Sequence, residues 1–137
     1  MWDIKYLEDL NQRRQKVKVG GGEKIDAQHS KGKLTGWECI LGSFQEVGSL
    51  VGSRFTDFGI DKKKLPGGGV IIGFGTINGV PVYVAAEDFT VIGGTYGEYH
   101  SKKIVRIIDM AFQSKASFVT INDSGGVRME EGISGLD

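Results

Sequence analysis

The sequence lacks features that mark several classes of protein. Cys39 is the only cysteine in 137 residues, so no disulfide can form within the chain, and we expect a reducing compartment, the cytoplasm. No Cys-x-x-Cys or His-Glu-x-x-His pattern occurs, so we expect no metal. No apolar run is long enough to cross a membrane, and early charges argue against a signal peptide. The 17 basic and 17 acidic residues balance, which disfavours a general nucleic-acid binder.

Glycine is the residue in excess. The chain has 22 glycines, which is about twice the usual usage. They follow no regular period, which excludes collagen, and they cluster between apolar runs. Such clusters predict tight turns and close approach of the backbone to a ligand or to a neighbouring element.

Residues 1–55 are expected to form an N-terminal helical and connecting segment. Apolar residues at roughly helical spacing predict a helix over residues 2–19, and Gly20 begins the glycine run that ends it. A polar, basic stretch follows at 24–35. The short apolar stretch at 37–41 is a candidate for another helix.

Residues 56–137 are expected to form part of an α/β domain. Two β-type runs, at 70–77 and 80–86, are separated by Asn78-Gly79. Asn-Gly between apolar runs is the strongest short-range signal of a hairpin, because a type I′ turn needs positive φ at both central residues.

A long helix is predicted after the second strand. Thr95 and Glu98 fit a capping box, in which each side chain meets the backbone N–H of the other residue. We expect the helix to fade near Lys115. Its apolar stripe is formed by Ile104, Ile107, Ile108, Ala111 and Phe112. Its opposite, polar side is expected to carry Lys102, Lys103 and Arg106.

A third strand at 117–122 leads into a second glycine loop and a second helix. The order strand, glycine loop, helix, strand over residues 80–134 is a βαβ unit, which requires a parallel strand pair and a right-handed crossover. Both glycine loops then lie at the carboxyl ends of strands, where α/β folds place ligands.

Six blocks of sequence occur in one order. They are TDFG at 56–59, PGGGVI at 66–71, GFGTING at 73–79, DFTVIGG at 88–94, EYHSKKI at 98–104 and NDSGGVRMEEG at 122–132, with further matches at 31–35 and 42–44. In this order they resemble the β subunits of biotin-dependent acyl-CoA carboxyltransferases, over roughly residues 10–137. The propionyl-CoA or methylmalonyl-CoA branch, including its decarboxylase subunits, is the most similar. One cysteine excludes the four-cysteine zinc ribbon often found in the bacterial acetyl-CoA branch.

The resemblance implies a fold and an activity. The fold is a crotonase-like ββα superhelix of ClpP/crotonase type, present here as an incomplete N-terminal portion. The activity moves a carboxyl group between carboxybiotin and the α-carbon of a short acyl-CoA. The resemblance further implies biotin on a partner carrier protein or domain, a biotin carboxylase subunit, and a homo-oligomer or a completing subunit.

The second glycine loop is a candidate oxyanion site. Removal of the α-proton puts negative charge on the thioester oxygen, and preorganised backbone N–H groups can stabilise that charge. The family likeness favours Gly125, Gly126 and Val127 as donors at the start of a helix, where free amides favour an anion. The alternative is a helix-start turn with no ligand.

Five more residues are candidates for binding the acyl-CoA, each with a plainer alternative. Gly93 and Gly94 could form a backbone wall near the pantetheine, or only a strand-to-helix turn. Lys31 and Lys33 could contact CoA phosphates as point charges, or form a solvated basic face. Arg128 could face a phosphate or carboxylate, or be an exposed helix arginine.

His100 could be a general base by residue type, although its place in the first turns of a helix favours capping or packing. Glu130 and Glu131 resemble no acid/base pair, because helix neighbours point in different directions.

The sequence departs from the family pattern in three places. Family chains are several times longer, so we expect this chain to lack the second glycine pair and the biotin-binding C-terminal domain. Residues 36–39 replace an Arg-Glu-Arg-like pattern, which removes positive charge. Val127 stands where alanine is typical, which narrows the acyl pocket.

These departures leave three hypotheses for the function. The first is part of a carboxyltransferase that is inactive alone. The second is a non-catalytic remnant or an assembly or CoA-binding module, which would expose apolar surface and associate. The third, a general nucleotide-binding α/β domain, is disfavoured because the Gly-x-Gly-x-x-Gly and Walker A spacings are absent.

Overall fold

The structure of the chain is a computed structural model that describes residues 4–40, 42–53 and 67–135. The block at 56–59 and the start of the block at 66–71 lie outside these residues. The elements are α1 Ile4–Val19, α2 Lys24–His29, β1 Gln45–Val47, β2 Val70–Ile77, β3 Val80–Glu87, the 3₁₀ turn η2 Ile92–Gly94, α3 Glu98–Gln113, β4 Ser117–Ile121 and the 3₁₀ segment η3 Met129–Gly135. No helix in these described ranges is long and apolar enough to cross a membrane.

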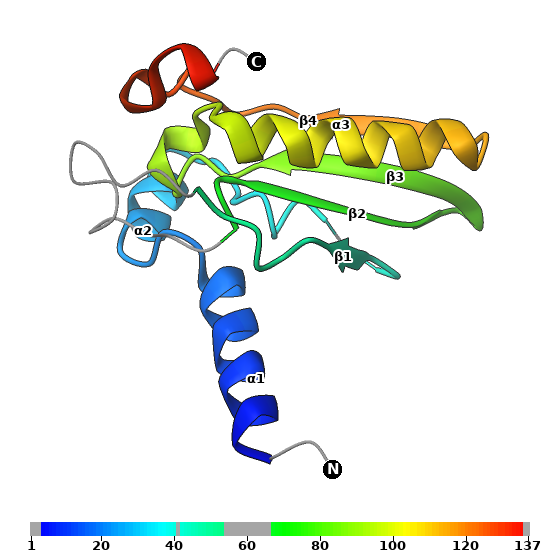
Figure 1. The fold of residues 1–137 in the computed structure, drawn as a ribbon, viewed down its shortest axis with the longest axis horizontal. Helices are drawn as coiled ribbons and strands as arrows, with labels where there is room; N and C mark the ends of the chain where they lie inside the picture. The colour runs from blue at the N-terminus through cyan, green and yellow to red at the C-terminus, as the bar shows by residue number, and fades with distance from the viewer. Residues whose placement is uncertain (1–3, 41, 54–66, 136–137) are drawn as a thin grey trace.

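The strands form one sheet in the order β1-β2-β3-β4 (Figure 1). The pairs β1/β2 and β2/β3 are antiparallel, and β3/β4 is parallel, with α3 as the crossover between them. The predicted βαβ unit is therefore confirmed. The predicted hairpin is confirmed as well: Asn78 and Gly79 have φ of 51° and 80°, as a type I′ turn requires.

Helix α3 packs on one face of the sheet and closes a small apolar core. The core is formed by Val70 and Ile72 of β2, Ala85 of β3 and Ile107 of α3. Full burial of each large aliphatic side chain contributes about 1.5–3 kcal/mol. This core joins β2, β3 and α3, and Phe118 of β4 packs against it.

The buried side of α3 differs from the predicted stripe. The residues that face the sheet are His100, Lys103, Ile107 and Ala111, at helical spacings of three and four. Lys103, predicted on the polar side, is 3% exposed, and its ammonium donates to the carbonyl oxygens of Gly67 and Val70. Ile108 and Phe112, predicted as apolar stripe, are exposed. Carbonyl groups of the glycine turn provide the partners that make a buried lysine tolerable.

The predicted capping box at the start of α3 is wrong. The N-cap is Gly97, and the Thr95 hydroxyl donates to the carbonyl of Ile92 at 2.7 Å. The N–H of Glu98 instead donates to Oε2 of Glu131 at 2.8 Å. A Cβ on Gly97 would overlap the Glu131 carboxylate. Because this carboxylate caps the helix from a distant part of the chain, the N-cap position has no room for a side chain.

Two other predicted helices differ from the structure. Residues 36–39 form turns in which the Cys39 N–H donates to the carbonyl of Thr35, so no α-helix forms there. After the second glycine loop the chain forms η3, a 3₁₀ segment interrupted at Gly132, where φ is 56° and ψ −137°. This break prevents α-helical hydrogen bonding along the segment.

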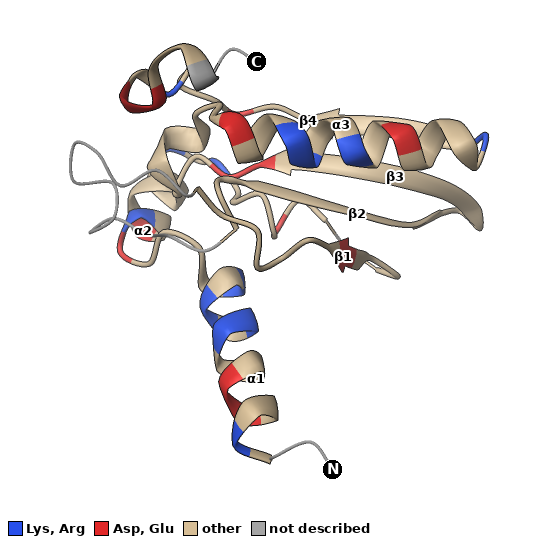
Figure 2. Ribbon diagram, in the orientation of Figure 1, with Lys and Arg blue, Asp and Glu red and all other residues tan. Residues whose placement is uncertain are grey.

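Helix α1, predicted from its apolar spacing, is confirmed, but it packs little. Figure 1 shows it extending away from the sheet, and Val17 is its only buried residue. Figure 2 shows a basic residue at its beginning, acidic residues next and basic residues toward its end. Tyr6 is 69% exposed. The segment thus forms the predicted helix, but most of its apolar side chains are exposed to solvent.

Candidate functional site

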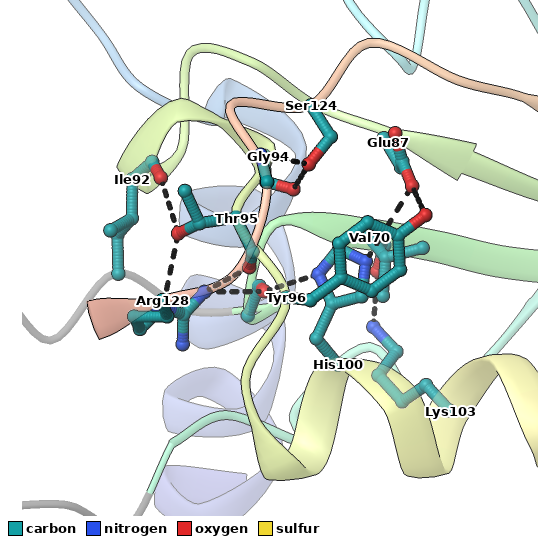
Figure 3. Close-up of polar contacts among 12 residues, drawn as sticks. Val70, Glu87, Ile92, Gly94, Thr95, Tyr96, His100, Lys103, Ser124 and Arg128 are labelled. Atoms are coloured by element: carbon teal, nitrogen blue, oxygen red, sulfur yellow. Dashed lines mark hydrogen bonds and ion pairs between the residues drawn. The ribbon is translucent and has the colours of Figure 1, made fainter. Parts of the chain in front are cut away.

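The two predicted glycine loops meet at the carboxyl ends of β3 and β4. The N–H of Gly125 donates to the carbonyl oxygen of Gly93 at 2.8 Å. The Ser124 hydroxyl donates to the carbonyl oxygen of Gly94, also at 2.8 Å (Figure 3). The glycines predicted as separate features therefore belong to one site.

Glycine is needed where the loops touch. Gly93 and Gly94 have φ of 63° and 61°, a region that side-chain-bearing residues rarely adopt. A Cβ on Gly94 would overlap the carbonyl oxygen of Asp123, whereas one on Gly93 would meet only the Thr95 methyl group at 3.8 Å. Gly94 thus permits the close packing of the two loops.

Tyr96 holds the second loop in an isolated parallel bridge opposite Val127. Its N–H donates to the carbonyl of Gly126 at 2.8 Å, and its own carbonyl accepts from the N–H of Arg128 at 2.7 Å. In such a bridge the N–H of the intervening residue points away from the partner strand. The Val127 N–H accordingly has no acceptor among the described residues, and Val127 is 43% exposed.

The three predicted oxyanion donors are therefore not equivalent. The amide of Gly125 is already used by Gly93, so it is not free for a ligand. The amide of Gly126 donates to the hydroxyl of Ser124 at 3.1 Å, and Gly126 itself is exposed. Val127 offers the amide with no internal acceptor in the described part of the chain. No α-helix starts at this loop, so an α-helix dipole contributes nothing there.

A pocket of about 260 Å³ lies between α2 and the first glycine loop. Its lining is formed by Lys24, Ala27, Gln28, Lys31, Phe89, Thr90 and Gly93. Two predicted residues, Lys31 and Gly93, therefore lie in one cavity, with Gly94 buried beside it. Lys24, Gln28 and Phe89 were missed by sequence reasoning; an aromatic residue directly after a strand was the one available signal.

Lys33 lies apart from this lining. Its ammonium donates to Oδ1 of Asp123 at 2.8 Å and lies 5.8 Å from the centre of the Phe89 ring. The side chain of Lys33 is about half exposed. The predicted pair Lys31 and Lys33 is thus divided: the first lines the pocket, and the second binds a carboxylate.

Arg128 is buried, contrary to both readings of the sequence, a ligand contact or an exposed helix arginine. It is 2% exposed, and its guanidinium donates to Glu131 at 2.8 Å and to the Thr95 carbonyl at 2.8 Å. A longer contact, at 3.4 Å, reaches the carbonyl of Gly68. Each nitrogen of the Arg128 guanidinium thus donates to a group inside the chain. Burial alone raises the pKa of Glu131, but hydrogen bonds from Arg128 and from backbone and side-chain neighbours lower it overall.

His100 packs beneath the loops, as the position in the helix favours. Its Nδ1 lies 3.2 Å from the carbonyl of Gly68, and burial lowers its pKa to about 4. Its Nε2 lies 4.0 Å from Oε1 of Glu87, which accepts a hydrogen bond from the Tyr96 hydroxyl (Figure 3). This hydrogen bond raises the pKa of Tyr96 to about 12. His100 is thus a neutral packing group at neutral pH.

An apolar pocket of about 250 Å³ lies on the sheet face that α3 leaves uncovered. Alternating strand residues such as Val82, Val84 and Val119 line it, together with Cys39 and Phe44. The part of the chain that the structure describes contains no group of three or more side chains placed to hold a metal ion.

Comparison with known proteins identifies the family of the chain. A family model described as the carboxyl transferase domain matches residues 27–137, so the chain belongs to that family. The predicted family and the predicted crotonase-like α/β fold, present in part, are both confirmed.

Among individual relatives, the propionyl-CoA carboxylase beta chain of Roseobacter denitrificans is 51% identical over 95% of this chain and 27% of its own length. The methylmalonyl-CoA decarboxylase subunit alpha of Veillonella parvula is 46% identical over the same shares. A solved transcarboxylase 12S structure, a hexamer with methylmalonyl-CoA and methylmalonic acid bound, has a TM-score of 0.92 and 41% identity, and covers 99% of this chain and 28% of its own. The chain thus spans about a quarter of the length of these relatives.

Proposed function

We propose that this chain forms the acyl-CoA-binding part of a carboxyltransferase that moves a carboxyl group between carboxybiotin and the α-carbon of a short acyl-CoA, such as propionyl-CoA or methylmalonyl-CoA. One observation carries the proposal. The hydrogen-bonded glycine loops lie directly beside the pocket that contains Lys31 and Phe89. A CoA thioester needs a charged, partly aromatic pocket at its nucleotide end and an amide donor at its thioester end, and within the described ranges the Val127 amide has no other acceptor.

The pocket suits the nucleotide end of CoA. Lys24 and Lys31 line the pocket, and their ammonium groups would serve as point charges for phosphates. Phe89, which is 38% exposed, offers an aromatic surface for a base. Gly93 lets the backbone approach the ligand closely.

The second glycine loop suits the thioester end. The amide of Val127 would donate to the thioester oxygen as negative charge develops on it, which lowers the barrier to loss of the α-proton. The exposed Val127 side chain would narrow the space for the acyl group and favour a short chain.

Biotin, bound to a partner carrier protein or domain, supplies the activated carboxyl group, and we assign no residue of this chain to it. We propose that the other partners are a biotin carboxylase subunit and a homo-oligomeric or completing carboxyltransferase chain, in the cytoplasm. Because the chain spans about a quarter of its relatives, we expect no carboxyl transfer from it alone.

Calorimetric titration with CoA tests the proposal. We expect binding by the unmodified chain and a threefold to tenfold loss in Lys31→Gln, since one exposed ion pair contributes about 0.2–1 kcal/mol and a pocket contact somewhat more. Lys16→Gln, on the exposed part of α1, is the matched control and should bind as the unmodified chain does. Absence of CoA binding, or equal binding by Lys31→Gln, would contradict the assignment.

The second candidate is a non-catalytic assembly or CoA-binding module, favoured by the apolar pocket on the sheet face opposite α3. A carboxyl-transfer assay with and without candidate carboxylase subunits separates the two. Transfer only in their presence supports the enzyme part, and CoA binding without transfer in any combination supports the module. Binding of a dinucleotide without CoA would instead support a nucleotide-binding domain.

A further inference from the structure

Asp123 lies between the end of β4 and the second glycine loop, and two side chains from the N-terminal segment hold it. Lys33 Nζ donates to Oδ1 at 2.8 Å, and Gln28 Nε2 donates to Oδ2 at 2.7 Å. Gln28 is 4% exposed. The hydrogen bond from Lys33, with a smaller one from Gln28, lowers the pKa of Asp123, so the carboxylate is charged at neutral pH. Both of its oxygens therefore have a defined donor.

Asp123 in turn fixes the loop that follows it. Its carbonyl oxygen occupies the space beside Gly94 where a Cβ would otherwise lie. The next two residues are bonded to the same partner loop: Ser124 to the carbonyl of Gly94 and Gly125 to the carbonyl of Gly93. A shift of Asp123 would therefore move the amides of Gly126 and Val127.

The same N-terminal segment lines the pocket. Gln28 and Lys31 are both lining residues, while the Lys33 ammonium points to Asp123 and lies near the Phe89 ring. One short stretch, residues 24–33, thus contacts the pocket on one side and the start of the loop on the other.

We propose that Lys33 is a positioning residue for the second glycine loop and not a phosphate ligand. Together with Gln28 it holds the Asp123 carboxylate, and through it the amides of Gly126 and Val127, in place. The role in positioning an acyl-CoA rests on the proposed function; the hold on the loop does not.

Two measurements on the 137-residue chain test this role. The first is amide hydrogen exchange of Gly125, whose N–H closes the loop on Gly93. The second is the ratio of the affinities for propionyl-CoA and CoA, because only the former carries the thioester oxygen that the loop would hold. The variants are Lys33→Gln, the conservative Lys33→Arg, and Lys31→Gln as the matched control, with circular dichroism to confirm folding.

In Lys33→Gln, we expect hydrogen exchange of the Gly125 amide to accelerate by up to about fivefold. This factor corresponds to the free energy that an exposed ion pair contributes. The affinity ratio should fall, and Lys33→Arg should restore both. Asp123→Ala, which removes both bonds, should accelerate exchange further. Lys31→Gln should weaken both ligands equally and leave exchange unchanged.

Unchanged Gly125 exchange in both Lys33→Gln and Asp123→Ala would overturn the proposal. So would equal weakening of the two ligands in Lys33→Gln, the behaviour of a phosphate contact. If the unmodified chain binds neither ligand, the proposed function fails, while the exchange measurement still decides whether Lys33 holds the loop.

Discussion

Gly125 donates its backbone N–H to the carbonyl oxygen of Gly93 at 2.8 Å, and this bond joins the loops that follow two neighbouring parallel strands. This bond brings the two glycine-rich loops together in one site. It also determines which amides remain for a ligand: the Gly125 donor is used, whereas the Val127 donor beyond it has no acceptor among the residues that the structure describes. The site thus depends on how closely the two loops approach.

Substitution of Gly94 should test this approach. Gly93 and Gly94 share a left-handed conformation, so alanine at either costs about 1–2 kcal/mol of backbone strain. Only at Gly94 does the added Cβ overlap the Asp123 carbonyl, which should add about 1–3 kcal/mol. Urea unfolding of Gly93→Ala and Gly94→Ala measures the difference. Equal stability of the two variants would mean that the loops can separate at little cost.

Arg128→Met should be strongly destabilising. Arg128 and Glu131 form an ion pair at 2.8 Å, with side chains 2% and 1% exposed. Removing one partner of a buried pair leaves an uncompensated charge and costs about 3–5 kcal/mol. Arg13→Met breaks the exposed pair with Asp9 and should change the free energy of unfolding by less than about 1 kcal/mol. Similar losses in both variants would show that the buried pair of Arg128 and Glu131 stabilises the fold no more than the exposed pair does.

Much of the fold could be predicted from the sequence because it is encoded locally. The hairpin follows from Asn78-Gly79, and the parallel pair follows from the order of strand, helix and strand. The hairpin depends on two adjacent residues whose backbone preferences are strong whatever surrounds them, and the parallel pair depends on the order of the elements along the chain.

The predictions that were wrong concern side chains whose partners lie in other elements of the fold. The cap of α3 comes from Glu131, and the burial of Lys103 depends on the carbonyls of Gly67 and Val70. The glycines of the site could be predicted from the family likeness, but not which amide stays free, since the bond between Gly125 and Gly93 forms only on folding.

Tyr96→Phe should weaken the fold more than Tyr83→Phe. The Tyr96 hydroxyl donates to Glu87, which is 3% exposed, so its loss leaves a buried acceptor without this donor, at about 1–3 kcal/mol. The Tyr83 hydroxyl pairs with Ser114 at an exposed position and should matter less. Thermal unfolding of the two variants gives the comparison, and a larger loss in Tyr83→Phe would refute the ranking.

The pKa of Tyr96, about 12, offers an independent check on the same bond. Its folded-state pKa lies above the ordinary value of about 10, so the folded chain binds more protons between pH 10 and 12. Stability from this group is present below pH 10 and is lost as pH rises through 12. Absorbance titration of Glu87→Gln should shift this tyrosine back toward 10; an unchanged high pKa would assign the shift to burial.

The stability of the chain should also fall in mild acid because of His100. Burial lowers its pKa to about 4, whereas an unfolded histidine titrates near 6.5. Between these values the unfolded chain binds more protons than the folded one, so the free energy of unfolding decreases as pH falls from about 6.5 to 4. The difference between the two pKa values corresponds to about 3–4 kcal/mol, since one pKa unit is about 1.4 kcal/mol.

Urea unfolding at several pH values measures this slope. In His100→Gln the slope between pH 6.5 and 4 should become shallower, even if the variant is less stable throughout, because the titrating group is gone. His29→Gln is the matched control: His29 is exposed and bonded to Glu38, so its loss should leave the His100 slope in place. An equally steep slope in His100→Gln would place the acid sensitivity on the carboxylates instead, and His100 would then be protonated in the fold without penalty.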